Sequence, residues 1–235
     1  MRGLIAFDLD GVLYSSEPFL GEAYREAIAG VNANRPGSFP RVPSTREILD
    51  HVGWPVPVIL AKLFPEIDPA AVQLLYAETL TVICSHVARG EGLLFPGVTE
   101  TLPRLRASGW LMAIASNGRR RYVETVLAAS GIAAYFTERV TVDGEASIKE
   151  KAGLLRAYLA RHGLTPRQLI MIGDRASDVE AATSVGCRFI GCDYGHGYRH
   201  EIENAGPLVS AFDQLPGVID ELESGTVLPN AGLPE

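Results

Sequence analysis

Residues 4–11 read LIAFDLDG, a short apolar run that ends at two aspartates and a glycine. A continuous apolar run that stops at a turn is typical of a strand buried on both faces. Four later runs have a similar form, the last of them weaker: 111–115, 169–172, 187–192 and 139–142. The chain therefore contains the repeated buried strands that a parallel sheet requires.

Amphipathic helical patterns lie between these strands. Glycine follows each pattern near its last periodic residue, where helices usually stop. The helices are expected at 98–107, 122–129, 151–161 and 179–185. This alternation of strand and helix predicts an α/β fold, with a Rossmann-like parallel sheet covered by helices on both faces.

Residues 15–93 interrupt the alternation, because they contain no convincing strand. Helical patterns in this segment cover 22–29, 44–53, 57–64 and 68–90. We therefore expect residues 1–14 and 94–223 to form the core and residues 15–93 to form an all-helical insertion. Residues 224–235 are rich in Gly and Pro, so we expect a mobile tail there.

The composition is that of an ordinary globular protein, with 47% apolar and 21% charged residues. The formal net charge is −7 and the only basic run is Arg119–Arg120–Arg121, so no nucleic-acid partner is expected. Three cysteines cannot complete a set of disulfides. The apolar start is too short for a signal peptide, and no stretch approaches the length of a membrane-spanning helix. We expect a cytoplasmic protein with no membrane partner.

Asp8 and Asp10 lie two residues apart at the end of the first strand, where an extended chain points both side chains the same way. Two carboxylates that close repel each other unless a cation or a shared proton intervenes, and oxygen ligands suit Mg²⁺. An aspartate can also attack phosphorus and form an aspartyl-phosphate. A turn built from Asp10 and Gly11 is the simpler alternative, but it leaves Asp8 unexplained.

Other strand ends carry polar residues as well. Ser116 and Asn117 end a strand and open a helix, which offers a hydroxyl and free N–H groups to an anion, although a plain helix cap would look the same. Asp174 directly follows a buried strand and is placed to bind a metal. Asp178 either supports that site or simply caps the next helix.

Lys149 and Lys151 fall at the opening of the helix expected at 151–161, where cations oppose the helix dipole. A local rule broken without visible compensation suggests a functional position. An exposed lysine remains a reasonable interpretation for one of the two.

Taken in order, these motifs resemble those of the haloacid dehalogenase (HAD) superfamily, in its phosphoglycolate phosphatase-like branch with a helical cap. Residues 7–13 (FDLDGVL) resemble the first motif, Ser116 the second, and residues 173–178 (GDRASD) the fourth. The resemblance extends to about Leu222 and implies that residues 15–93 form the cap. It also implies the strand order 5-4-1-2-3, with the first strand at a topological switch point.

The resemblance implies a division of labour among the acids. Asp8 is the nucleophile and a metal ligand. Asp10 is the general acid and base, and it offers its backbone carbonyl to Mg²⁺. Asp174 binds the metal, and Asp178 supports the metal site from behind.

The resemblance also implies how the phosphate is held. Ser116 and the backbone amide of Asn117 bind it. The lysine of the third motif is Lys149 by an ungapped comparison, or Lys151, because the usual Lys-Pro pair is absent.

The motifs favour a Mg²⁺-dependent phosphatase that hydrolyses a small phosphorylated metabolite through an aspartyl-phosphate. The alternative is a sugar-phosphate mutase of the β-phosphoglucomutase type, which shares the motifs and the cap type. A catalytically inactive binding protein is disfavoured, because every chemical position is filled. Substrate choice is expected to come from the cap, whose candidate anion-binding residues are Arg41, Arg46, Lys62 and Arg89. The sequence indicates neither the substrate nor the oligomeric state.

Overall fold

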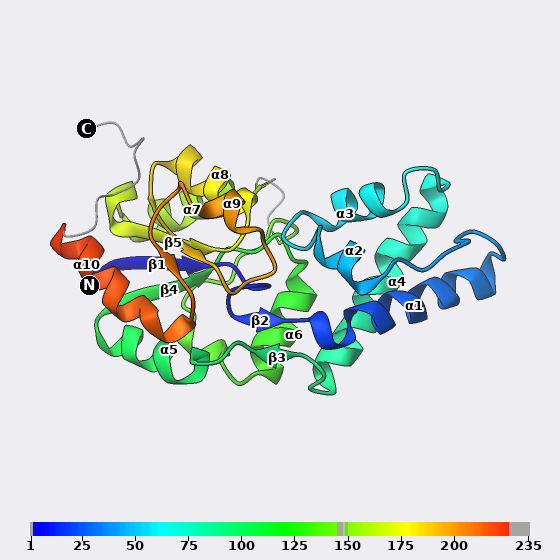
Figure 1. Ribbon diagram of the computed structural model, residues 1–235, viewed down its shortest axis with the longest axis horizontal. Coiled ribbons are helices and arrows are strands. Elements are labelled where there is room, and N and C mark those ends of the chain that lie inside the picture. The colour runs from blue at the N-terminus through cyan, green and yellow to red at the C-terminus, as the bar shows by residue number, and fades with distance from the viewer. Residues whose placement is uncertain (1, 145–147, 149, 226–235) are drawn as a thin grey trace.

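The computed structural model describes residues 2–144, 148 and 150–225 of the 235-residue chain. At its centre is a five-stranded sheet in the order β4-β1-β5-β6-β7, with every neighbouring pair parallel (Figure 1). The strands are β1 (Gly3–Phe7), β4 (Trp110–Ile114), β5 (Leu169–Gly173), β6 (Arg188–Cys192) and β7 (Leu208–Val209). The predicted α/β fold is confirmed.

Helices cover both faces of the sheet. Side chains along β1 alternate between the two faces, so each face presents apolar side chains on which helices pack. Ile5 and Phe7 belong to one hydrophobic cluster, and Leu4 and Ala6 to another. The first cluster includes α5 (Val98–Ala107), α6 (Arg120–Ala129) and α10 (Leu215–Ser224); the second includes α7 (Lys151–His162), α8 (Ala176–Val185) and α9 (Arg199–Ile202). The two groups of helices lie on opposite sides of the sheet (Figure 1).

One edge of the sheet differs from the expected order. The strand expected at 139–142 is absent, and only an isolated bridge joins Ala113 to Glu138. The hydroxyl of Tyr158 bonds the backbone of Val140 and the carbonyl of Ile114, so a side chain takes the place of ladder bonds there. At the opposite edge, β7 extends the sheet beyond β6.

Short 3₁₀ helices cover Ala133–Tyr135, Pro166–Gln168 and Phe212–Gln214.

The segment after β1 is helical, as expected, and lies to one side of the sheet (Figure 1). It contains α1 (Glu17–Asn34), α2 (Thr45–Leu49), α3 (Val56–Leu63) and α4 (Pro69–Ala88), which we call the helical insertion. Ser44 and Glu47 form a capping box at the start of α2, and Asp68 caps α4. The insertion has its own hydrophobic cluster, which includes Tyr24 and Leu75.

The helical insertion is joined to the sheet by two adjacent chain segments. β2 (Tyr14–Ser15) and β3 (Leu93–Leu94) pair antiparallel, two short strands that the sequence patterns did not indicate. Their pairing places the entry and exit of the insertion side by side. The division into domains at residues 14 and 94 remains a prediction. Of the expected tail, Ser224 ends α10, and residues 226–235 lie outside the described residues.

The expectation that no stretch approaches membrane-spanning length was wrong for α4. Its 20 residues reach a mean hydropathy of 1.3 and meet the length and composition of a membrane-spanning helix. This helix packs within the protein, however, and contacts α1, α3 and α6. These contacts account for part of its apolar composition, since 33% of the apolar window is buried inside the protein.

Candidate active site

The site lies where three adjacent strands end. Asp8 follows β1, Ser116 lies just beyond β4, and Asp174 follows β5. The backbone hydrogen bonds of the sheet continue to the strand ends. The amide of Asp8 donates to the carbonyl of Ile172, and the amide of Ala115 donates to the carbonyl of Phe7. Because parallel strands end at the same edge of a sheet, the three side chains meet although they are far apart in the sequence.

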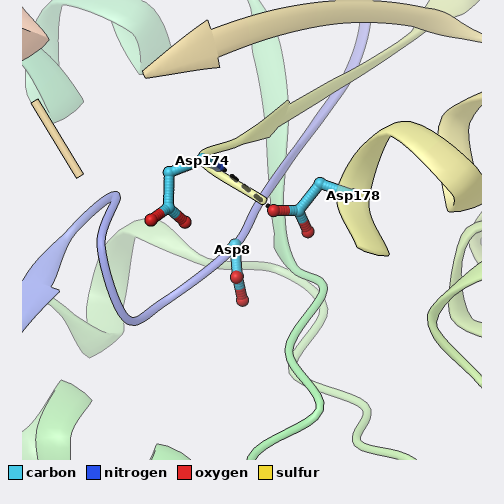
Figure 2. Close-up of side chains that lie close together, drawn as sticks. All are labelled: Asp8, Asp174 and Asp178. Carbon is cyan, nitrogen blue, oxygen red and sulfur yellow. Dashed lines mark hydrogen bonds between the residues drawn. The ribbon is translucent and has the colours of Figure 1, made fainter. Parts of the chain in front are cut away.

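Three carboxylates gather at this edge. One oxygen from each of Asp8, Asp174 and Asp178 lies within 4.8 Å of the others. Figure 2 shows them approaching from the ends of β1 and β5 and from the first turn of α8. Asp178 accepts hydrogen bonds through Oδ2 from the amides of Asp174 and Arg175, at 3.1 and 3.0 Å. The hydrogen bonds that this side chain accepts from backbone amides are those of a helix cap. Its other carboxylate oxygen, Oδ1, points into the site.

Lys151 occupies the site from the first position of α7. Its Nζ lies 3.0 Å from Oδ2 of Asp8 and 2.5 Å from Oδ1 of Asp178, and the lysine is 3% exposed. Burial alone would lower the pKa of this ammonium, but Asp178 and Asp8 together raise its pKa above the usual range. Lys149, the other candidate, lies outside the described residues.

The carboxylates carry more negative charge than the ammonium group balances. Burial raises the pKa of Asp8 well above its usual range, against the opposing effect of Lys151. Burial, with help from Asp178, raises the pKa of Asp174 from 3.8 to about 7. Oδ1 of Asp174 is buried and has no hydrogen-bond partner in the described part of the chain. A hard cation with oxygen ligands fits these groups, because it would satisfy that oxygen and neutralise the cluster.

The loop after β6 fixes Asp174 by hydrogen bonds, and the turn at Gly11 packs closely against it. Its Oδ2 accepts hydrogen bonds from the amides of His196 and Gly197, at 2.8 and 3.0 Å. A Cβ on Gly197 would lie 1.8 Å from the carbonyl oxygen of Asp174, and one on Gly11 would lie 2.2 Å from Oδ2. Gly11 also has a φ of +83°. Glycine is therefore required at both positions, since a side chain at Gly11 would displace the carboxylate and one at Gly197 would collide with the backbone of Asp174.

Asp10 faces away from this cluster, toward the helical insertion. Its Oδ1 accepts hydrogen bonds from the hydroxyl of Tyr122, at 2.5 Å, and from that of Ser16, at 3.4 Å. Burial raises the pKa of Asp10 from 3.8 to about 6, while these hydrogen bonds oppose the rise. Tyr122 could not be recognised as a site residue from the sequence, because an aromatic residue in an amphipathic helix looks like a core residue.

The two residues expected to hold phosphate behave differently. Ser116 is 3% exposed, and its Oγ accepts a hydrogen bond from the amide of Gly118 at 3.0 Å. The side chain of Asn117 instead donates to the carbonyl of Gly53 in the helical insertion, at 2.8 Å. Arg175 also bonds the insertion, through the carbonyl of Leu49. Asn117 thus links the loop after β4 to the insertion.

A third contact joins the loop after β6 to α2. The hydroxyl of Tyr198 donates to Oδ1 of Asp50 at 2.9 Å and accepts from Arg46 at 2.7 Å. In the same loop His196 is half-buried, and His200 is exposed.

A cavity of about 80 Å³ opens between the strand ends and the helical insertion. Asp8, Asp10, Ser116 and Asn117 line its floor. The basic residues first considered for substrate choice are exposed and lie outside the lining: Arg41, Arg46, Lys62 and Arg89. The lining instead includes Arg119.

The sequence profile of the haloacid dehalogenase-like hydrolases matches residues 3–186. The chain belongs to this family. Within it, the phosphoglycolate phosphatase of Haemophilus influenzae strain 86-028NP is 33% identical over 214 residues, covering 87% of this chain and 91% of the relative. That of Vibrio cholerae serotype O1 is 32% identical, covering 87% and 90%. The predicted family and the predicted enzyme class, a HAD-type hydrolase, are confirmed, and these relatives are phosphatases.

Solved structures of HAD proteins share the fold. A predicted phosphoglycolate phosphatase from Haemophilus somnus 129PT superposes with a TM-score of 0.80 at 24% identity, covering 93% of this chain and 99% of that one. CbbY from Rhodobacter sphaeroides, in complex with phosphate, gives 0.74 at 22% identity, covering 93% and 100%. The likeness therefore extends through both the sheet and the helical insertion.

Proposed function

We propose that this HAD enzyme is a Mg²⁺-dependent phosphatase that hydrolyses a small phosphorylated metabolite, in the manner of the phosphoglycolate phosphatases it resembles. The observation that carries the proposal is the position of Asp8. Its carboxylate lies beside an ammonium group and two further carboxylates, one strand away from Ser116. A nucleophile, a phosphate-binding hydroxyl and a place for a cation are the groups that phosphoryl transfer needs.

The reaction runs in two steps. The carboxylate of Asp8 attacks phosphorus and forms an aspartyl-phosphate, and the departing oxygen takes a proton from Asp10. Asp10 then accepts a proton from water as that water attacks the phosphorus. The second step releases phosphate and restores Asp8. A carboxyl with a pKa of about 6 suits both halves, because it gains and loses a proton readily near neutral pH.

The remaining residues position the phosphoryl group and neutralise its charge. Ser116 and the backbone amide of Asn117 bind phosphate oxygens, and Lys151 balances the charge on Asp8 and the phosphoryl group. Asp8, Asp174 and the carbonyl of Asp10 would hold Mg²⁺, supported by Asp178, and the ion supplies neutralisation of the phosphoryl charge. The helical insertion acts as a cap that closes over the cavity.

The alternative, a sugar-phosphate mutase, requires a second anion site in the cap and exclusion of water from the intermediate. Of the basic residues considered in the insertion, none lines the cavity. The absence of these residues from the lining favours hydrolysis over transfer to a second phosphate ester. The cytoplasmic location remains a prediction.

Measuring phosphate release from 2-phosphoglycolate, with Mg²⁺ and with a chelator, tests the proposal. We expect release only with Mg²⁺ and none from Asp8→Asn, since an amide cannot serve as the nucleophile. Glucose 1-phosphate with a trace of bisphosphate tests the mutase. Rapid formation of glucose 6-phosphate with little free phosphate would replace phosphatase by mutase, and activity in Asp8→Asn would overturn both.

A further inference from the structure

Arg119 is a buried cation in the wall of the cavity. It lies three residues after Ser116, directly before α6, and is 7% exposed. Its guanidinium lies 4.4 Å from the centre of the Tyr76 ring and donates to the carbonyl of the same residue. A second donation, at 3.3 Å, goes to Oγ1 of Thr79. Both partners belong to α4, so the guanidinium is held between the helical insertion and the loop after β4, which carries Ser116 and which we call the phosphate loop.

No carboxylate balances this charge among residues 2–144, 148 and 150–225, in which Arg119 forms no ion pair. Burial lowers the pKa of Arg119, and the groups that oppose this effect are Tyr76, Tyr24 and Cys84 rather than an acid. A guanidinium has five N–H donors, and the described residues accept from only two of its nitrogens. Burying an unpaired charge is strongly unfavourable, so the arrangement calls for an anion.

The rest of the cavity wall on the side of the insertion is mainly apolar, although the hydroxyl-bearing residues Ser16 and Tyr24 also line it. Most of this wall is formed by Leu20, Ile48, Val52, Trp54, Val56, Ile59, Leu80 and Ile83. Sugar hydroxyl groups placed against this wall would lose their hydrogen bonds to water without replacement. A short carbon chain has no hydrogen bonds to water to lose against this wall.

We propose that Arg119 selects the substrate by binding a carboxylate on the organic part of a short-chain phosphomonoester, whose phosphoryl group lies at Asp8 and Ser116. A planar carboxylate matches the remaining donors of the guanidinium fork, and its charge balances the buried cation. The inference rests on the proposed phosphatase function, and it assigns the choice of substrate to the phosphate loop of the core, where the sequence had suggested the basic residues of the cap.

Two substrates of equal length test the proposal: 2-phosphoglycolate, which carries a carboxylate, and 2-hydroxyethyl phosphate, which is neutral at that end. We expect the native enzyme to prefer the first by about 10- to 100-fold in kcat/KM, the size of a charge-assisted hydrogen bond. Arg119→Met should bring the ratio near one while 2-hydroxyethyl phosphate is still hydrolysed. Arg119→Lys should give an intermediate ratio.

Arg121→Met is the matched control, because Arg121 is exposed two residues away and lies outside the lining. It should keep the full preference. A structural role of Arg119 in holding α4 would change both substrates alike and leave the ratio intact. An undiminished ratio in Arg119→Met, or no preference in the native enzyme, would overturn the proposal.

Calorimetric binding to the Asp8→Asn protein separates this inference from the proposed function. Tighter binding of 2-phosphoglycolate than of 2-hydroxyethyl phosphate, lost on adding Arg119→Met, would support Arg119 even if the native chain hydrolysed neither compound. Equal binding of both would refute the role of Arg119 while leaving a phosphatase in place. Tighter binding of ethylene glycol bisphosphate than of 2-phosphoglycolate would refute the carboxylate in favour of a second phosphate.

Discussion

The hydroxyl of Tyr122 donates a hydrogen bond to Oδ1 of Asp10 across 2.5 Å, so α6 reaches directly to the proposed general acid. Ser16, at the start of the helical insertion, donates to the same oxygen. The protonation of Asp10 therefore depends on groups from both the core and the insertion.

Tyr122→Phe should move the pH dependence of kcat/KM. Asp10 must carry a proton to protonate the leaving group, so kcat/KM falls as pH rises through its pKa of about 6. The Tyr122 hydrogen bond lowers that pKa, so its loss should shift the falling limb to higher pH by about one unit. Initial rates across pH 5–9 measure the shift. A limb that stays in place would show that Asp10 is not the acid.

Asp10→Asn and Asp174→Asn should fail in different ways. The first removes acid–base help, so we expect a loss of about 10²–10⁴-fold in kcat with the Mg²⁺ concentration for half-maximal activity little changed. The second removes a side-chain ligand and should raise that concentration strongly. Mg²⁺ titration of both variants decides the matter. An equal loss of metal affinity in Asp10→Asn would contradict the proposed roles.

The metal-free protein should become more stable as pH falls from about 7 toward 4. The folded pKa of Asp174 is about 7, above its ordinary value of 3.8, so the folded state binds the proton more tightly in this window. The free energy of unfolding then decreases as pH rises, by up to a few kcal/mol in order of magnitude. Urea unfolding at several pH values measures it. Asp174→Asn should flatten the dependence, and an equally steep one would implicate other groups.

Asn117→Ala should weaken substrate binding more than chemistry. The variant keeps the backbone amide proposed to bind phosphate and loses only the bond to the carbonyl of Gly53. One such bond contributes on the order of 1 kcal/mol, so we expect KM to rise about fivefold with kcat nearly unchanged. Ser177→Ala is the matched control, since its bond to the same carbonyl is longer, at 3.4 Å. A tenfold fall in kcat alone would place the Asn117 side chain in the chemistry.

The sequence by itself determined the fold class and the location of the acids. Asp8 and Asp174 each follow an apolar run long enough only for a buried strand, and parallel strands must end at a common edge. Their meeting could therefore be predicted without coordinates. The capping box of Ser44 and Glu47 is also predictable from the sequence, because it depends only on residues three apart in the chain.

Tertiary structure alone decided what surrounds these acids. The sequence left Lys149 and Lys151 open, and only the packing of α7 against the sheet brings Lys151 to Asp8. The same holds for Tyr122 and Arg119, whose contacts follow from the approach of α6 to Asp10 and from the packing of α4 on α6. Spacing along a chain fixes which face of its own helix or strand a side chain occupies. It does not fix which distant element that face will meet, because that depends on the packing of segments tens of residues apart.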